Sequence, residues 1–244
     1  MLASVGTAGW SIPRDVADEF PSEGSSLERY AARFRVAEIN SSFHRPHRLS
    51  TWERWRDSVP EEFRFSVKVP KTITHQARLV GCGELLGAFL DQACVLGDKL
   101  AILLVQLPPK LGLDVPQASA FFRELASATG AQIACEPRNP GWFAEEADGL
   151  LYDLHVARVA ADPALSDAAS RPGGWTGLNY WRLHGSPRMY RSSYSDRICS
   201  YADLLRSAGD APAWCIFDNT ASSAATGDAL ALLGQLGSEA SFSR

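Results

Sequence analysis

The chain has 244 residues, of which 45% are hydrophobic and 10% aromatic, and this is enough to bury a substantial core. Its formal net charge of -4 and its pI near 5.8 exclude a protein that wraps nucleic acid through a global basic field. No stretch has the composition of a linker or a low-complexity segment, so we predict one domain over residues 1–244.

The cysteines and the apolar runs predict the compartment. The longest apolar run, residues 101–105, is far shorter than a membrane span, and the N-terminus lacks a basic leader. The cysteines are odd in number and form no CxxC pair, which argues against a disulfide framework or a zinc knuckle. They are Cys82, Cys94, Cys135, Cys199 and Cys215. We therefore expect a cytoplasmic protein with no membrane partner.

Short β-prone runs alternate along the chain with segments of helical spacing, as in parallel βα units. The predicted strands are residues 4–7, 36–40, 64–68, 100–106, 132–136, 157–160, 181–184 and 214–217. The predicted helices include residues 26–34, 85–96, 117–129, 144–155 and 227–236. Eight such units in about 250 residues match the size of a (β/α)8 barrel, which is the predicted fold. A doubly wound open sheet is the alternative.

Charged residues in the predicted strands share one face with residues two positions away. Glu38 and Asn40 alternate with Ala37 and Ile39 in the second strand. Both faces of a barrel strand are covered by protein, so the polar face must point into the lumen. Charges of both signs at strand ends are typical of barrel active sites. The predicted mouth contains Glu38, Lys68, Glu136, Arg138, Asp162, Arg182 and His184.

The same charges also fit a purely structural role. Arg182 with Glu38, and Lys68 with Glu136, would form a buried ion-pair network. Because desolvation offsets much of the attraction within a buried ion pair, a whole layer of such pairs is a weak way to stabilise a barrel. We therefore favour a ligand site.

Several segments around these strand ends resemble a known family. They are GTAGW at residues 6–10, EINSSFHR at 38–45, FSVKVPKTITH at 65–75, QLPP at 106–109, EPRNPGWF at 136–143, YWRLHG at 180–185 and FDN at 217–219. In this order they resemble the YecE-like family, also called domain of unknown function 72. The resemblance implies a TIM-type barrel and no particular reaction. The chain departs from the family's usual residues at His44, Asn139 and Asp218.

The charged mouth predicts an enzyme acting on a phosphorylated or nucleotide-like substrate. A hydrolase, a transferase and a lyase are all compatible with it. Glu38 or Glu136 would be the general base, and His184 its acid or base partner. Barrels often bind phosphate at strand ends, and aromatic rings can stack on a base or sugar. The predicted substrate-binding residues are Lys68, Arg138, Arg182, Asn40, Gln106, Trp10, Trp142 and Asp218.

The alternative function is a non-catalytic module that binds nucleic acid or a small anion at the same mouth. A third possibility is a divalent metal held by the carboxylates and His184. The basic neighbours already compensate those carboxylates, and the spacing matches no metal motif. We therefore predict no metal and no cofactor. The sequence does not indicate an oligomeric state.

Overall fold

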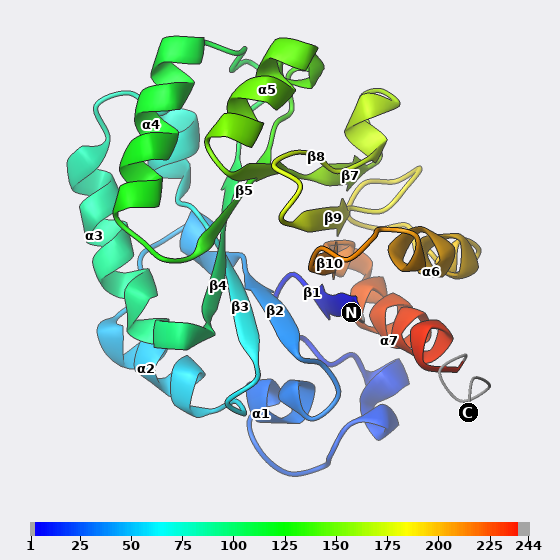
Figure 1. The fold of residues 1–244 in the computed structure, drawn as a ribbon. Coiled ribbons are helices and arrows are strands. Elements are labelled where there is room, and N and C mark those ends of the chain that lie inside the picture. The colour runs from blue at the N-terminus through cyan, green and yellow to red at the C-terminus, as the bar shows by residue number, and fades with distance from the viewer. Residues whose placement is uncertain (1–2, 239–244) are drawn as a thin grey trace.

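The alternating pattern folds as predicted into a ring of parallel strands with helices outside it (Figure 1). The computed structural model describes residues 3–238. The ends of the predicted domain, residues 1–2 and 239–244, lie outside the described residues. The strands are β1 Ser4–Thr7, β2 Val36–Ile39, β3 Arg64–Lys68, β4 Leu100–Gln106, β5 Gln132–Glu136, β6 Val156–Arg158, β7 Ala160–Asp162, β8 Gly173–Gly174, β9 Asn179–Leu183 and β10 Ala213–Phe217.

Two sheets join to close the ring. One has the order β1-β10-β9-β7, and the other has β2-β3-β4-β5-β6-β8. At one seam Ala8 bridges to Glu38, and the Gly9 N–H donates to the Glu38 carbonyl at 2.8 Å. At the other seam the predicted sixth strand is divided at Val159, so that β6 pairs with β5 and β7 pairs with β9. With β6 and β7 as one strand, and with antiparallel β8 outside the ring, this is the predicted (β/α)8 barrel.

The helices lie between the strands in sequence and cover the outside of the barrel (Figure 1). They are α1 Ser26–Ala31, α2 Leu49–Asp57, α3 Gly83–Ala93, α4 Val115–Ser127, α5 Glu145–Asp153, α6 Ile198–Arg206 and α7 Ala224–Ser238. Ser25 and Glu28 form a capping box at the start of α1. The predicted helix 85–96 is interrupted after Ala93, and Gly97 beyond it has a φ of 57°. Within residues 3–238, no helix is long and apolar enough to cross a membrane.

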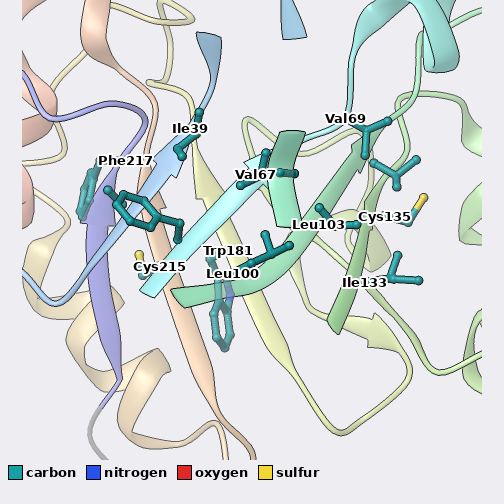
Figure 2. Close-up of a cluster of buried hydrophobic side chains, with 14 of the residues drawn as sticks. Ile39, Val67, Val69, Leu100, Leu103, Ile133, Cys135, Trp181, Cys215 and Phe217 are labelled. Carbon is teal, nitrogen blue, oxygen red and sulfur yellow. The ribbon is translucent and has the colours of Figure 1, made fainter. Parts of the chain in front are cut away.

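Strand alternation divides the core into two parts. Figure 2 shows helix-facing side chains of successive strands, among them Ile39, Val67 and Phe217, which pack under the outer helices. The opposite face carries a second apolar cluster inside the barrel. Its members include Val36, Ile102, Leu104, Ala134, Trp214 and Ile216. Val36, Ile102 and Trp214 lie in the first halves of their strands and form an apolar floor. Polar side chains such as Glu38, two residues after Val36, lie nearer the carboxyl ends and therefore above it.

Gly6 allows β1 to approach β2 at the barrel seam. A Cβ atom at this position would lie 2.3 Å from the carbonyl oxygen of Val36. Because that oxygen belongs to the backbone of a buried strand, it cannot rotate away as a flexible side chain would. The seam therefore requires glycine here.

We expect Gly6→Ala to lower the free energy of unfolding by about 1–3 kcal/mol, the usual cost of overpacking. Gly87→Ala is the control, because Gly87 is exposed on α3 and a Cβ atom added there would meet no other atom of the described residues within 4 Å. That change should be neutral or stabilise the helix by up to about 1 kcal/mol. Urea unfolding measures both. Equal stability of the two variants would contradict the close approach of β1 and β2.

Candidate functional site

Arg182 lies at the centre of the polar layer above the apolar floor. Its guanidinium is fully buried. It donates to both oxygens of Glu38, from Nε at 2.9 Å and from Nη2 at 2.6 Å. Nη1 donates to Glu136 at 2.5 Å, and Nη2 also donates to Asp218 at 3.0 Å. One cation therefore binds carboxylates from β2, from β5 and from the residue after β10.

His184 follows Arg182 by two residues and lies on the same face. Its Nδ1 is 3.0 Å from Asp218 Oδ2, and its Nε2 is 2.8 Å from Glu136 Oε1. Arg138 Nη2 is 2.7 Å from the same Nε2 and also pairs with Glu136. An imidazolium donates to both carboxylates, whereas the neutral ring donates at Nδ1 and accepts from Arg138 at Nε2. Nε2 is thus a position where a proton can be held or released.

Two carboxylates of this cluster, Glu136 and Asp218, are weak bases because their pKa values are lowered. Burial alone would raise the pKa of Glu136, but the charges of Arg138 and Arg182 hold it well below its usual value. Burial alone would also raise the pKa of Asp218, but the charge of Arg182 and the hydrogen bond to His184 lower it below its usual value. Glu38 accepts from Arg182 at both oxygens and also from the Tyr180 hydroxyl at 3.1 Å. The lowered pKa argues against Glu136 as the general base, whereas the general-base role of Glu38 stays a prediction.

Lys68, at the end of β3, is the cation outside this network. It is 6% exposed, and no carboxylate of residues 3–238 lies within 4.0 Å of its Nζ. Nζ instead lies over the ring of Phe43, 4.3 Å from its centroid. Burial, followed by the charge of Arg182, lowers the pKa of Lys68 to about 8. The more distant carboxylates of Glu38, Glu136 and Asp218 act in the opposite direction and raise this pKa. The ammonium group therefore lacks only a direct ion pair.

Two predicted amide residues also lie at the mouth. Gln106 is opposite Glu136 in the β4–β5 register. Asn40 directly follows β2, and its Oδ1 is buried without a hydrogen-bond partner among the described residues. Because buried polar atoms are nearly always hydrogen-bonded, Asn40 marks a position where a ligand group or water belongs.

Comparisons with known proteins identify the family to which this charged barrel belongs. The profile of the family described as "Protein of unknown function DUF72" matches residues 4–243. The chain belongs to this family. It is 33% identical over 171 residues to the UPF0759 protein YecE of Escherichia coli K12. The aligned region covers 68% of this chain and 61% of YecE. The matched region thus spans about three fifths of this curated relative.

Solved structures agree with the DUF72 assignment. A DUF72 family protein from Enterococcus faecalis superposes with a TM-score of 0.79 at 20% identity, covering 96% of this chain and 95% of the other. L-ribulose 3-epimerase superposes with a TM-score of 0.58 at 13% identity, covering 100% and 99%. At these identities the likeness concerns the fold alone, and it confirms the TIM-type barrel.

Two aromatic residues predicted to bind substrate lie outside the lumen of the DUF72 barrel. The Trp10 ring packs edge-on against Trp55 at 5.2 Å and Phe65 at 6.3 Å, beside the helix-facing core. Trp142 is 1% exposed, and its Nε1 donates to the Leu111 carbonyl at 3.0 Å. Both follow strand ends in irregular segments, where strand alternation no longer fixes the direction of a side chain. We correct their assignment to core packing.

Asp162 also lies outside the predicted mouth. In the β7–β9 register it pairs with Leu183, which faces the helices, whereas Ala161 pairs with Arg182 and faces the lumen. Its carboxylate accepts from Arg197 at 2.7 Å and from the Tyr201 hydroxyl. The prediction was wrong because side chains alternate along β7, so that Ala161 shares the lumen face of Arg182 and Asp162 takes the opposite face.

His75 and Tyr190 extend the site beyond the predicted residues. His75 lies in a π-helical turn, Thr72–Gln76, with its ring 5.1 Å from that of Phe43. Burial and the charge of Lys68 lower its pKa. The ring of Tyr190, 41% exposed, lies 5.7 Å from that of His184. Sequence analysis missed His75, although π-helical turns are frequent at functional sites.

The donor set does not form a metal-ligand shell. Among residues 3–238, no group of three or more His, Cys, Asp or Glu side chains is arranged to hold a metal ion. The carboxylates that a cation would need are directed at Arg182. The absence of a bound metal or cofactor stays a prediction.

Arg182→Met should lower the free energy of unfolding by about 3–5 kcal/mol, because it leaves buried carboxylates without their cation. Lys68→Met is the matched control. It removes a similar buried cation from the same layer but leaves no ion pair broken, so its stability at pH 7 should equal or exceed that of the wild type. Urea unfolding distinguishes the two. Similar losses in both variants would show that Lys68 also belongs to the ion-pair network.

The amine of Lys68 should titrate near pH 8. Its folded pKa lies below the ordinary value of 10.5, so the unfolded chain binds the proton more tightly. This group's effect on stability therefore becomes more favourable as the pH rises from about 8 to 10.5. Reductive methylation with ¹³C-formaldehyde and an NMR titration measure the pKa, and the Lys68→Arg variant assigns the signal. A midpoint near 10.5 would contradict the burial argument.

Proposed function

We propose that this DUF72 protein is an enzyme that performs acid–base chemistry on a small phosphorylated substrate at the carboxyl mouth of the barrel. The observation that carries the proposal is the ammonium group of Lys68, which is buried but has no carboxylate of the described residues within 4.0 Å. Buried charges in proteins are normally paired. A phosphate oxygen at Nζ would complete the pair that the described residues do not supply.

Arg138 supplies a second contact for the phosphate. Its side chain is 12% exposed, and its Nε has no hydrogen-bond partner among the described residues. Arg182 is fully buried and its donors are occupied by carboxylates. We therefore assign substrate binding to Lys68 and Arg138, and we assign Arg182 to positioning.

The acid–base step belongs to His184. Because Arg138 contacts His184 Nε2 at 2.7 Å, a substrate held by Arg138 lies next to a nitrogen that can take up or release a proton. Asp218 at Nδ1 fixes the ring orientation, as carboxylates do for catalytic histidines. L-ribulose 3-epimerase, named for a free sugar, has a similar fold, and the proposed phosphate at Lys68 adds the anionic group, so sugar phosphates are the first substrates to test.

We expect phosphorylated compounds to raise the melting temperature of the wild-type protein. A ligand present at a hundredfold excess over its Kd adds about 2.7 kcal/mol to the free energy of unfolding. Lys68→Ala and Arg138→Ala should each weaken binding by about 1–3 kcal/mol, the range for charge-assisted hydrogen bonds. Lys110→Ala is the control, because Lys110 is exposed in the loop after β4. A panel of phosphate, sugar phosphates and nucleotides, followed by thermal melts, makes the comparison.

Turnover is measured in the same mixtures by ³¹P and ¹H NMR. The proposal predicts conversion of at least one bound compound, and a loss of that conversion in His184→Asn without loss of binding. Binding without conversion would favour the alternative, a non-catalytic module for an anion or nucleic acid. No melting shift with any anion would overturn the proposal.

A further inference from the structure

A pocket of about 240 Å³ lies beside the mouth, between the segment after β2, the segment after β3 and helix α3. Its walls are mainly apolar and include Phe43, Trp52, Leu85, Ala88 and Phe89. Leu85 is 44% exposed at the rim although it belongs to an apolar wall. The volume far exceeds the roughly 30 Å³ that one water occupies in the liquid. The pocket is therefore large enough for a small organic group.

Two neighbouring residues connect this pocket to Lys68. Phe43 lines the pocket, and Lys68 Nζ lies over its ring, 4.3 Å from the ring centroid. Ser42 also lines it and donates to the Lys68 carbonyl at 2.7 Å. The pocket and the unpaired ammonium group are thus separated by about one side chain. A single ligand can reach both.

The charge around the pocket favours an anionic ligand. Its lining contains Arg45 and His44 but no Asp or Glu of the described residues. The surrounding segment, residues 41–48, carries two arginines, two histidines and no acid, although the whole chain has a net charge of -4. Apolar walls next to unopposed cations complement a molecule that has an apolar part and an anionic part.

Two polar side chains of the pocket, Gln92 and Ser42, are already hydrogen-bonded within the protein. Gln92 accepts from the His47 N–H at 3.0 Å and donates to the Ala88 carbonyl at 2.9 Å. Ser42 donates to the carbonyls of Ile39 and Lys68. The pocket thus offers shape and aromatic contact rather than hydrogen bonds to the edge of a ring.

We infer that this pocket, called the ring pocket below, binds the planar ring of a nucleotide-like substrate whose phosphate lies at Lys68. The inference rests on the proposed function and narrows its substrate class. Planar rings stack on aromatic walls without needing hydrogen bonds. A spacer of the size of ribose places ring and phosphate one side chain apart, on the two sides of Phe43.

The test compares adenosine 5′-monophosphate with ribose 5-phosphate, which lacks the ring. By isothermal titration calorimetry, the wild type should bind the nucleotide at least about tenfold more tightly. Ala88→Phe fills the ring pocket from α3 and should bring the two affinities within about threefold, with ribose 5-phosphate unaffected. Ala120→Phe places the same side chain at an exposed position of α4 and should keep the wild-type ratio.

The outcomes separate this inference from the proposed function. The assignment of the ring pocket is wrong if Ala88→Phe keeps the wild-type ratio of the two affinities. It is also wrong if the wild type binds both compounds equally. The proposed function then still stands, provided that ribose 5-phosphate binding depends on Lys68. If neither compound binds the wild type, both proposals fail. Should Ala88→Phe not fold, Leu85→Glu at the exposed rim replaces it and should weaken nucleotide binding selectively by charge repulsion.

Discussion

The hydrogen bonds of the Arg182 guanidinium fix the arrangement of the whole mouth. A buried carboxylate without a cation is strongly unfavourable, and Glu38, Glu136 and Asp218 all direct oxygens at this one group. They come from strands that are far apart in the sequence. Arg182 therefore ties several sectors of the barrel to one geometry, and His184 takes its position from two of the same carboxylates.

This network separates stability from binding. Its members neutralise one another, so they hold their positions whether or not a ligand is present. Lys68 lies in the same layer without such a partner among the described residues, and its burial lowers its pKa to about 8. A site preorganised in this way loses little conformational freedom when a ligand binds. The ion pairs thus fix the geometry of the mouth, and Lys68 is the cation in this layer that they leave without a direct ion pair among the described residues.

The alternation of strand-like and helix-like segments predicted the barrel. The alternation of side chains within each strand predicted the lumen residues Glu38, Lys68, Glu136, Arg182 and His184, because a period of two is strict within a paired strand. It did not decide which charges pair, since that depends on strand register and side-chain length. Of the two ion pairs considered from the sequence, Arg182–Glu38 forms, whereas Glu136 pairs with Arg182 and Arg138 rather than with Lys68. Side-chain alternation also failed past the strand ends. Trp10 and Trp142 turned into the core, and the ring pocket is formed by loops and α3, whose packing has no signature in the local sequence.

The apolar floor determines by which end of the barrel a ligand can enter and leave. Val36, Ile102 and Trp214 pack in the amino-terminal part of the lumen, and barrels of this type are filled by such layers of side chains and are not open pores. Whatever enters at the carboxyl end must leave by the same opening. For the proposed enzyme, a bound product would therefore exclude the next substrate until it dissociates. The product should act as a competitive inhibitor. Its dissociation would limit the turnover rate when it binds tightly.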